Sequence, residues 1–426
     1  MYMKEIQFPY GKEKLSYSFA DKEITAVLTS RIHDYCPGKT GDELVKAALQ
    51  APIGTPTLAQ MAKGKKNIVI IASDHTRPVP SKVIIPPMLE EIRSTSPDAD
   101  ITILIATGCH RGTTKQELID KFGEEIVAKE NIYIHDCDER EKLQNIGTLP
   151  SGGTCEVNSI AMNADLLLAE GFIEPHFFAG FSGGRKSILP GIAGRNTVLA
   201  NHCSEFIADP NARTGILENN PVHRDMLWAA ENAKLAFIVN VVLNEEKEVI
   251  HAVAGDSRQA HEAGVKFLSS LCGVSAVPAD VVITTNGGYP LDQNVYQAVK
   301  GMTAAEATVK EGGVIIMLAK SNDGTGGDHF YHQLADEPDI QKTMDLFMSR
   351  DRQETVPDQW QTQIMLRILM RASVIYISEM DDDAVRSMHM TPTHSLEDAM
   401  KLAKKILGKE SVTVTAIPDG VSVIVR

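Results

Sequence analysis

Short runs of Ile and Val alternate with helix-period segments along the first half of the chain. The apolar runs lie at 67–73 (NIVIIAS), 101–108 (ITILIATG) and 131–136 (NIYIHD), and the helix-period segments lie around 87–92 and 115–128. Runs that are apolar throughout, rather than at every second residue, indicate strands buried on both faces. Such strands alternating with helices form a mainly parallel sheet covered on both faces, so the sequence predicts an α/β fold.

The same rhythm continues and then repeats in the second half. Further strands are predicted at 165–170, 236–243, 280–285, 313–319 and 373–378, with later helices at about 293–310, 334–349 and 395–407. Residues 271–279 (LCGVSAVPA) contain Gly and Pro and are typical of a linker. We therefore predict two α/β domains with mainly parallel sheets, over 1–270 and 271–409. Because ligands of open α/β sheets bind beyond the carboxyl ends of the strands, the active site is expected in the cleft between these domains.

Both ends of the chain show a different pattern. Residues 6–28 alternate apolar and polar side chains around a break at Gly11, which is typical of antiparallel strands. Residues 412–426 show two alternating runs around Pro418-Asp419-Gly420, which favours a hairpin. Since this tail resembles the N-terminal strands, we expect 410–426 to pack back on the N-terminal domain.

Charge and cysteine content narrow the class of protein. The 426 residues include 42 Lys and Arg against 56 Asp and Glu, a net charge of −14 without a basic block. Such a chain is a poor candidate for binding nucleic acid or an anionic membrane surface. No apolar run approaches the roughly 20 residues of a membrane span, and the polar start lacks the apolar core of a signal peptide. The six cysteines form no C-x-x-C pair, which indicates reduced thiols and a cytoplasmic location.

The loops after the first two strands carry polar side chains. In the loop at 73–80, Arg77 could clamp a carboxylate or phosphate, or it could form an ion pair with Asp74 that merely closes the loop. In the loop at 107–114, His110 is well placed for proton transfer, although it could instead cap the next helix beside Thr113.

A glycine-rich segment at 174–191 (EPHFFAGFSGGRKSILPG) is the most informative one. Its ending suggests a phosphate loop, but the G-x-x-x-x-G-K-[ST] motif requires glycine where this chain has Arg185. The segment presents Lys186, with His176 ten residues before it and His202 after it. These three side chains do not have zinc-site spacing, and a simple anion-binding loop is the alternative.

The strand predicted at 280–285 ends in a glycine turn and a helix start. Gln297 and Lys300 are three residues apart, and Tyr296 and Lys300 are four apart, so the three share one helix face. Together they suit a small oxyanion such as a carboxylate, unless they form only a solvated first turn.

Taken together, the segments resemble the nickel-pincer-nucleotide lactate racemases. The resemblance covers nearly the whole chain in order, and it is carried by SDHTRPVPSK, GCHRGTT, EPHFFAGFSGGRKSILPGIAG, the NHC at 201–203 and YPLDQNVYQAVKGM. It implies two α/β domains with the active site between them. It also implies an isomerase that interconverts D- and L-lactate, together with cofactor-maturation enzymes as partners.

The resemblance further implies a prosthetic group and the residues around it. In the family, a pyridinium-3-thioamide-5-thiocarboxylate mononucleotide is tethered to a lysine through a thioamide and holds Ni(II), with a histidine as a further ligand. The matching residues are Lys186 and His202. The matching acid/base groups are His110 and His176. The residues matched to the surroundings of the cofactor and the substrate are Asp74, Arg77, Tyr296, Gln297, Lys300 and Trp360.

The implied chemistry meets the demands of the reaction. The α-proton of a 2-hydroxy acid is weakly acidic beside a carboxylate, whereas oxidation to a 2-keto acid avoids the carbanion. The α-hydrogen leaves as hydride to the cofactor, a base takes the hydroxyl proton, and both return on the opposite face of pyruvate. The hydroxyl group has a different orientation in each enantiomer, which explains why two histidines are needed for proton transfer. Planar sulfur and nitrogen donors suit Ni(II).

Other functions stay open at this stage. The same chemistry could act on malate, a longer aliphatic acid or a sugar acid, because specificity depends on a few pocket residues. A non-catalytic protein that binds a nucleotide or another anion through FSGGRKS and NGGY is a second class. A zinc hydrolase is a third class, which the histidine spacing does not favour.

Overall fold

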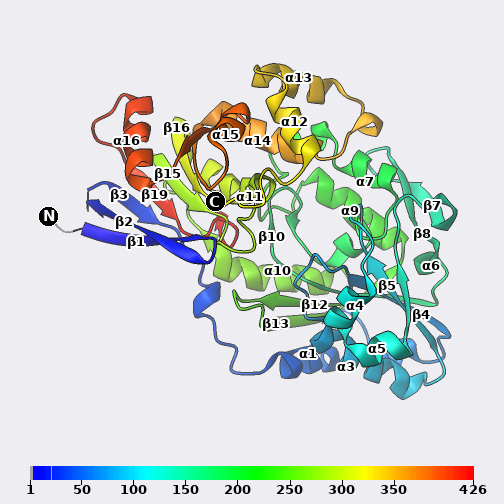
Figure 1. Ribbon diagram of the computed structural model, residues 1–426. Coiled ribbons are helices and arrows are strands. Elements are labelled where there is room, and N and C mark those ends of the chain that lie inside the picture. The colour runs from blue at the N-terminus through cyan, green and yellow to red at the C-terminus, as the bar shows by residue number, and fades with distance from the viewer. Residues whose placement is uncertain (1–2, 21) are drawn as a thin grey trace. The chain divides into compact units, whose positions relative to one another are not determined.

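The computed structural model describes residues 3–20 and 22–426, and the chain divides into two compact units (Figure 1). The N-terminal unit comprises Ile32–His202 and Asp209–Ser270. The C-terminal unit comprises Met1–Arg31, Cys203–Ala208 and Leu271–Arg426. The fold is α/β with mainly parallel sheets, as the sequence predicts.

A six-stranded sheet forms the centre of the N-terminal unit, in the order β13-β12-β9-β4-β5-β6. All pairs are parallel except β12 with β13. The predicted apolar runs form five of these strands, and the missed edge strand is β13. The bounds are β4 (Asn67–Ser73), β5 (Asp100–Ala106), β6 (Asn131–Ile134), β9 (Leu166–Phe172), β12 (Leu235–Leu243) and β13 (Val249–Gly255).

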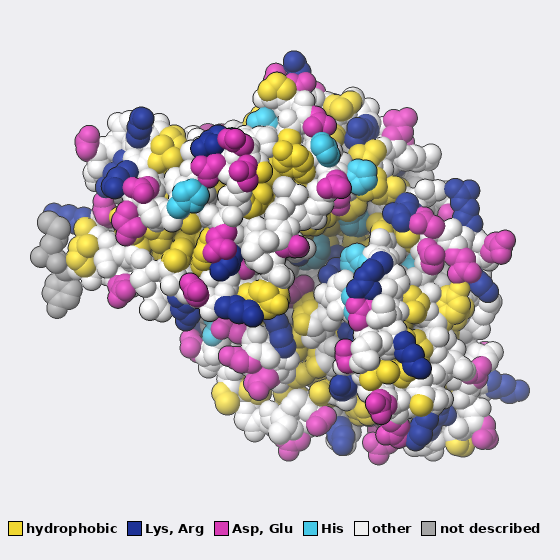
Figure 2. All heavy atoms as spheres, in the orientation of Figure 1, with side chains coloured by type: hydrophobic (Ala, Val, Ile, Leu, Met, Phe, Trp, Pro, Cys, Tyr) yellow, Lys and Arg dark blue, Asp and Glu magenta, His cyan; other side chains and the backbone are white. Residues whose placement is uncertain are grey.

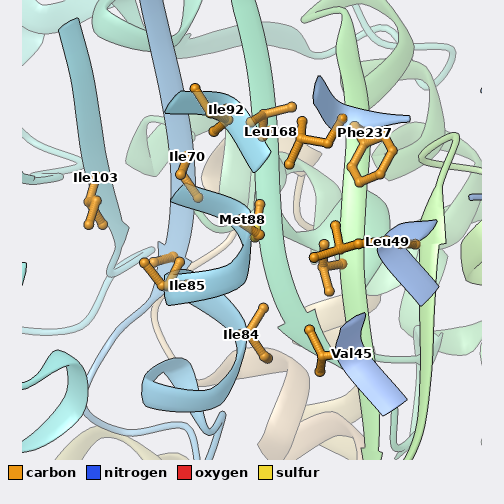
Figure 3. Packing of buried hydrophobic residues seen from close by; sticks show 14 of the residues in the cluster. Val45, Leu49, Ile70, Ile84, Ile85, Met88, Ile92, Ile103, Leu168 and Phe237 are labelled. Carbon is orange, nitrogen blue, oxygen red and sulfur yellow. The ribbon is translucent and has the colours of Figure 1, made fainter. Parts of the chain in front are cut away.

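Helices α1 (Gly41–Gln50) and α3 (Ser81–Thr95) supply apolar side chains to one core of this unit. Thr40 starts α1 through a capping box with Glu43. Successive side chains of a strand point to opposite faces, so the sheet needs apolar residues on both. The labelled side chains of Figure 3 come from these two helices and four strands: Val45, Leu49, Ile70, Ile84, Ile85, Met88, Ile92, Ile103, Leu168 and Phe237.

The remaining elements of the N-terminal unit connect the strands. The predicted helix at 115–128 is split at Gly123, whose φ of 89° ends the first helix. The elements are η1 (Ile32–Asp34), α2 (Leu58–Ala62), α4 (Lys115–Phe122), α5 (Glu124–Lys129), η2 (Arg140–Lys142), β7 (Leu143–Thr148), β8 (Thr154–Asn158), α6 (Ser159–Met162), β10 (Pro175–His176), β11 (Gly180–Phe181), η3 (Gly184–Ser187), α7 (Arg195–Asn201), α9 (Pro221–Asn232) and α10 (Gln259–Cys272).

The C-terminal unit contains a second six-stranded sheet, all parallel, in the order β18-β17-β16-β15-β19-β3. Its strands are β3 (Ile24–Val27), β15 (Ala279–Thr285), β16 (Val309–Leu318), β17 (Ser373–Ile377), β18 (Thr391–Thr393) and β19 (Val414–Ile417). Its helices are α8 (Ser204–Ala208), α11 (Val295–Glu306), α12 (Asp328–Ala335), α13 (Ile340–Ser349), η4 (Arg352–Glu354), α14 (Gln359–Arg371), α15 (Asp382–Ser387) and α16 (Leu396–Leu407).

The predicted antiparallel strands at the start of the chain form, but they belong to the C-terminal unit. β1 (Met3–Tyr10) pairs with β2 (Glu13–Ala20), and residue 21 of the predicted region lies outside the described residues. Phe8 and Phe19 of this hairpin are fully buried in the core that also contains Val281 and Met400. The hairpin therefore covers the second sheet rather than the first.

The expectation for the tail was wrong. Residues 410–426 do not pack on the N-terminal unit, because β19 lies between β15 and β3 in the second sheet. They also do not form a hairpin, since the final strand β20 (Ile424–Val425) pairs in parallel with β14 (Gly273–Val274). The cause is burial: Val414 and Ala416 are both fully buried, which the interior of a sheet provides and an exposed hairpin does not.

The surface agrees with the charge pattern of the sequence. Figure 2 shows acidic and basic side chains interspersed on the face in view, without a broad basic area. Within 3–20 and 22–426, no helix combines the length and the apolar character that crossing a bilayer requires.

Candidate active site

Three loops of the N-terminal unit start at one edge of its sheet. Asp74 follows β4, His110 lies beyond the end of β5, and His176 lies beyond the end of β9. These strands are parallel neighbours, so their carboxyl ends lie at the same edge. The backbone links the second loop to the glycine-rich segment, where the Gly108 N–H donates to the Gly191 carbonyl at 2.9 Å.

Asp74 and His110 form a hydrogen-bonded pair. Nδ1 of His110 lies 2.8 Å from Oδ2 of Asp74, whose side chain is 1% exposed while that of His110 is 43% exposed. Thr76 donates from Oγ1 to the other carboxylate oxygen at 2.7 Å. Burial raises the pKa of Asp74, but the hydrogen bonds from His110 and Thr76 outweigh it and lower the net pKa below 3.8. An ionised Asp74 places the ring proton on Nδ1, so Nε2 of His110 can accept a proton.

The sequence left two purely structural roles open, an Asp74–Arg77 ion pair and a helix cap formed by His110. The structure shows neither of them among these described residues. The carboxylate of Asp74 pairs with His110, whereas Arg77 is exposed and contacts Asp74 through its backbone N–H at 3.3 Å. The cap of α4 is Thr114, not His110. Thr113 instead lies 3.1 Å from Nδ1 of His75.

A buried network below the Asp74 loop was missed by the sequence analysis. Glu170 of β9 accepts at Oε1 from the Ser81 hydroxyl at 2.7 Å and from the Ser73 N–H at 3.3 Å. Lys121 donates to the carbonyls of Arg77 and Val79 at 3.3 and 3.4 Å. Burial raises the pKa of Glu170 and lowers that of Lys121. These bonds hold the loop that carries Asp74. The signal in the sequence was Glu170, a charged residue inside an apolar strand.

The glycine-rich segment is held by a buried arginine. Arg185 is 2% exposed and donates to the carbonyls of Ala179 and Gly183 and to Nδ1 of His223, at 2.8, 3.1 and 2.9 Å. Burial lowers its pKa to about 9. Gly184 has a φ of +54°, and a Cβ there would lie 2.8 Å from the His261 ring, so only glycine fits. This packing sets the position of the next residue, Lys186.

Lys186 lies against His176. Its Nζ is 3.1 Å from Nε2 of His176, and Nδ1 of that ring accepts the Ala179 N–H at 3.3 Å. Two donors therefore face a ring that has one acceptor nitrogen when neutral. Because Nδ1 accepts the Ala179 N–H, a neutral ring carries its proton on Nε2, the nitrogen that faces Lys186.

His202 lies near the same lysine. Its Nδ1 donates to the Val198 carbonyl at 2.9 Å, which leaves the lone pair of the neutral ring on Nε2. Burial and the nearby charge of Lys186 lower its pKa to about 3, so the ring is neutral. The Phe178 ring lies 5.1 Å from the His202 ring and 4.6 Å from the His176 ring. A neutral buried imidazole with one nitrogen fixed by a backbone carbonyl is the usual state of a metal-ligating histidine.

A second group of predicted residues lies within the C-terminal unit. Tyr296, Gln297 and Lys300 occupy the first turns of α11, which Asn294 caps by accepting the Gln297 N–H at 3.0 Å. Trp360 lies on α14, which packs against α11, and the next residue, Gln361, donates to the Tyr296 carbonyl. The predicted helix start is therefore confirmed.

Asp358 joins this second group and was also missed. It precedes α14 with a φ of +63°, and it hydrogen-bonds to the side chain of Tyr296. Burial raises the pKa of Asp358, although this hydrogen bond opposes the shift. Tyr296 also packs edge-on against Phe330 at 5.3 Å, so its ring is held from two sides.

Comparison with known proteins identifies relatives over the full chain. The families described as "Lactate racemase N-terminal domain" and "Lactate racemase C-terminal domain" match residues 10–215 and 274–425, and the second match includes the tail. A curated lactate racemase from Thermoanaerobacterium thermosaccharolyticum is 54% identical over 425 residues, with 100% of both chains covered. One from Lactiplantibacillus plantarum is 51% identical over 425 residues, again with 100% of both covered.

Solved structures agree with the sequence comparisons. The lactate racemase apoprotein from T. thermosaccharolyticum superimposes with a TM-score of 0.96 at 54% identity, over 99% of this chain and 100% of that chain. A protein from Thermotoga maritima has a TM-score of 0.65 at 18% identity over 92% of this chain and 100% of that chain, a likeness of fold alone.

Proposed function

The chain belongs to the lactate racemase family and is an isomerase, and from this premise we propose that it interconverts D- and L-lactate through pyruvate. The observation that carries the proposal is the pair of histidines at one sheet edge. His110 is paired with Asp74, and His176 is paired with Lys186.

His110 and His176 act as the two proton-transfer groups. Racemisation through a 2-keto acid requires the hydroxyl proton to be removed from either enantiomer, whose hydroxyl groups point in different directions. One base serves one orientation, and the second serves the other. His110 accepts at Nε2 because Asp74 holds its Nδ1 proton, the arrangement that also orients the base in a catalytic triad. His176 contacts Lys186 through Nε2 and accepts the Ala179 N–H at Nδ1, and we assign it the second proton-transfer role.

The surroundings of Lys186 fit a tethered nickel pincer nucleotide, the pyridinium-3-thioamide-5-thiocarboxylate mononucleotide of the family. Lys186 would carry it through a thioamide, and His202 would give its Nε2 lone pair to Ni(II). The fit rests on a neutral buried imidazole, with Nδ1 fixed by Val198, close enough to Lys186 for that charge to lower its pKa. Imidazole nitrogen with sulfur donors suits Ni(II). When bound, the group would supply a hydride acceptor and donor for the α-hydrogen, and Asp74 and Arg77 would help to hold it.

The substrate carboxylate is held by cationic and polar side chains. Arg77 is exposed at the end of the Asp74 loop and offers a planar pair of donors. Tyr296, Gln297 and Lys300 on α11 supply further donors beside a helix N-terminus, where an anion is favoured. Trp360 provides an apolar wall.

The test is a racemisation panel on protein produced together with cofactor-maturation enzymes, which we propose as partners. We expect D-lactate to be converted to the racemate, and peptide mass spectrometry to show a sulfur-containing nucleotide adduct on Lys186. Rapid turnover of malate, a longer aliphatic acid or a sugar acid without turnover of lactate would reassign the substrate. An unmodified Lys186, with maturation working on a control racemase, would favour an anion-binding protein instead. The cytoplasmic location stays a prediction.

A further inference from the structure

A groove of about 570 Å³ lies beside the loop that carries His110. Its lining includes two cysteines, Cys109 and Cys137, together with Asp138 and Arg195. Cys109 is partly exposed and Cys137 is buried. The groove belongs entirely to the N-terminal unit, and the proposed reaction uses neither thiol.

The fold brings these two thiols together. Cys109 follows β5 and Cys137 follows β6, which are parallel neighbours with Ile105 opposite Ile134. The strand ends stay joined beyond the ladder, since the Thr107 hydroxyl donates to the His135 carbonyl at 2.6 Å. Each thiol shifts the pKa of the other, so the two sulfur atoms lie close together. Both thiols line the same groove, so the two loops after these strands bring them to one surface.

The surroundings give the two thiols different pKa values. The hydrogen bond from Cys137 and the charge of Arg195 lower the pKa of Cys109, against the effect of burial. The pKa of Cys137 is raised by the same hydrogen bond and by burial. A partly exposed thiol with a lowered pKa is a reactive nucleophile, and a protonated neighbour is a thiol that can resolve its oxidised form.

A metal ion is a weaker reading of the same groove. Donor atoms of Asp136, Cys137 and Asp138 lie within 4.8 Å of one another. However, Arg195 donates to both carboxylate oxygens of Asp138 at 2.7 Å, so a cation would have to displace a bidentate ion pair.

We propose that Cys109 and Cys137 form a reversible oxidation site whose substrate is a small hydroperoxide that enters the groove. The Cys109 thiolate attacks one peroxide oxygen, the O–O bond breaks, and hydroxide leaves from hydrogen peroxide. The resulting sulfenic acid reacts with the Cys137 thiol: an S–S bond forms, the S–O bond breaks, and water leaves with the thiol proton. In total the two thiols lose two electrons and the peroxide gains them.

The position of the site links it to the proposed reaction. Cys109 directly precedes His110, whose Nδ1 lies 2.8 Å from Asp74. A bond between residues 109 and 137 would constrain the backbone next to this pair and limit the positions that the ring can take. Oxidation should therefore inactivate the enzyme, and reduction should restore it. This consequence rests on the proposed function, whereas the thiol chemistry does not.

The experiment treats the full-length protein with hydrogen peroxide, blocks remaining thiols, digests it and identifies linked peptides by mass spectrometry. We expect a peptide pair joined through Cys109 and Cys137, released by dithiothreitol. In Cys137→Ser, dimedone should trap the sulfenic acid on Cys109, with no linked pair. Cys272→Ser is the matched control, because that buried thiol accepts from the Ser30 hydroxyl and does not line the groove, and it should leave the linkage unchanged.

Racemase activity is the second readout. Loaded wild-type protein should lose on the order of tenfold in activity on oxidation and recover it with dithiothreitol. The Cys137→Ser variant cannot form the disulfide, so it should not show this loss and recovery through a disulfide. If the protein fails to racemise lactate, the linked peptide still tests the site. Peroxide that oxidises the exposed Cys36 while leaving Cys109 and Cys137 unlinked would overturn the proposal.

Discussion

At the residue scale, the proposed reaction depends on the direction in which one imidazole presents its lone pair. Asp74 is buried, hydrogen-bonded by Thr76 and held ionised by those bonds, whereas the His110 ring is exposed. The carboxylate therefore acts on the substrate only through the histidine. Its contribution is orientation and a fixed tautomer.

The substitution Asp74→Asn tests this dependence. The amide would donate to Nδ1 of His110 and place the ring proton on the wrong nitrogen, so kcat should fall by about 10²- to 10⁴-fold. KM should change little, because Asp74 does not bind the carboxylate. Steady-state kinetics of the loaded enzyme measure both quantities. Asp98→Asn, on the surface, is the control, and an equal loss in that variant would contradict the account.

At the element scale, the loops beyond β4 and β9 are held by buried side chains. Glu170 accepts from Ser73 and Ser81, while its Oε2 has no hydrogen-bond partner among the described residues. Arg185 fixes the segment that presents Lys186 through backbone carbonyls. Such networks set the geometry of the site without taking part in its chemistry.

Glu170 should give a measurable pH dependence of stability. Burial raises its pKa above 4.5, so ionisation costs more in the folded chain than in the unfolded one. Relative to Glu170→Gln, the wild type should lose stability as the pH rises above 4.5. Thermal unfolding at several pH values measures the difference. Glu170→Ala should instead be destabilised at every pH, by about 1–3 kcal/mol, because Ser73 and Ser81 lose their acceptor. A pH-independent difference between wild type and Glu170→Gln would contradict this reasoning.

Gly184→Ala tests the packing of the glycine-rich segment. Its Cβ would meet the His261 ring at 2.8 Å at a φ of +54°, so both strain and a clash arise. Gly152→Ala is the matched control, with a φ of +93° and open space around the added Cβ. We expect the first variant to lose about 1–3 kcal/mol more than the second and to carry less adduct on Lys186. Unfolding curves and peptide mass spectrometry measure the two effects, and equal losses would count against the tight fit.

At the scale of the whole molecule, the features of the fold that could be predicted from the sequence are those that depend on local sequence. Eight strands of the two sheets are visible as apolar runs, whereas β13 and β18 were missed. The order of β4, β5 and β9 along the chain implies that Asp74, His110 and His176 share one edge. The resemblance to the lactate racemases supplied the roles of Lys186 and His202, which spacing alone left open.

The unpredicted part depends on contacts between distant segments. β3 and β19 pair with each other in the second sheet, although nearly the whole chain separates them. Their alternating pattern revealed strands but not partners, because either sheet could accept an alternating edge. Glu170 and Lys121 were missed for the same reason, since each contacts the Asp74 loop only after the sheet has formed.

The central claim is that racemisation proceeds through pyruvate by hydride transfer rather than through a carbanion. The most direct test uses lactate labelled with deuterium at C2, incubated with the loaded enzyme in ordinary water and followed by mass spectrometry as it racemises. The account predicts that both enantiomers keep the deuterium, because a hydride returned from the bound cofactor does not exchange with water, while His110 and His176 move only the hydroxyl proton. Loss of deuterium to solvent at the rate of racemisation would contradict it, since a base would then be removing the α-proton directly.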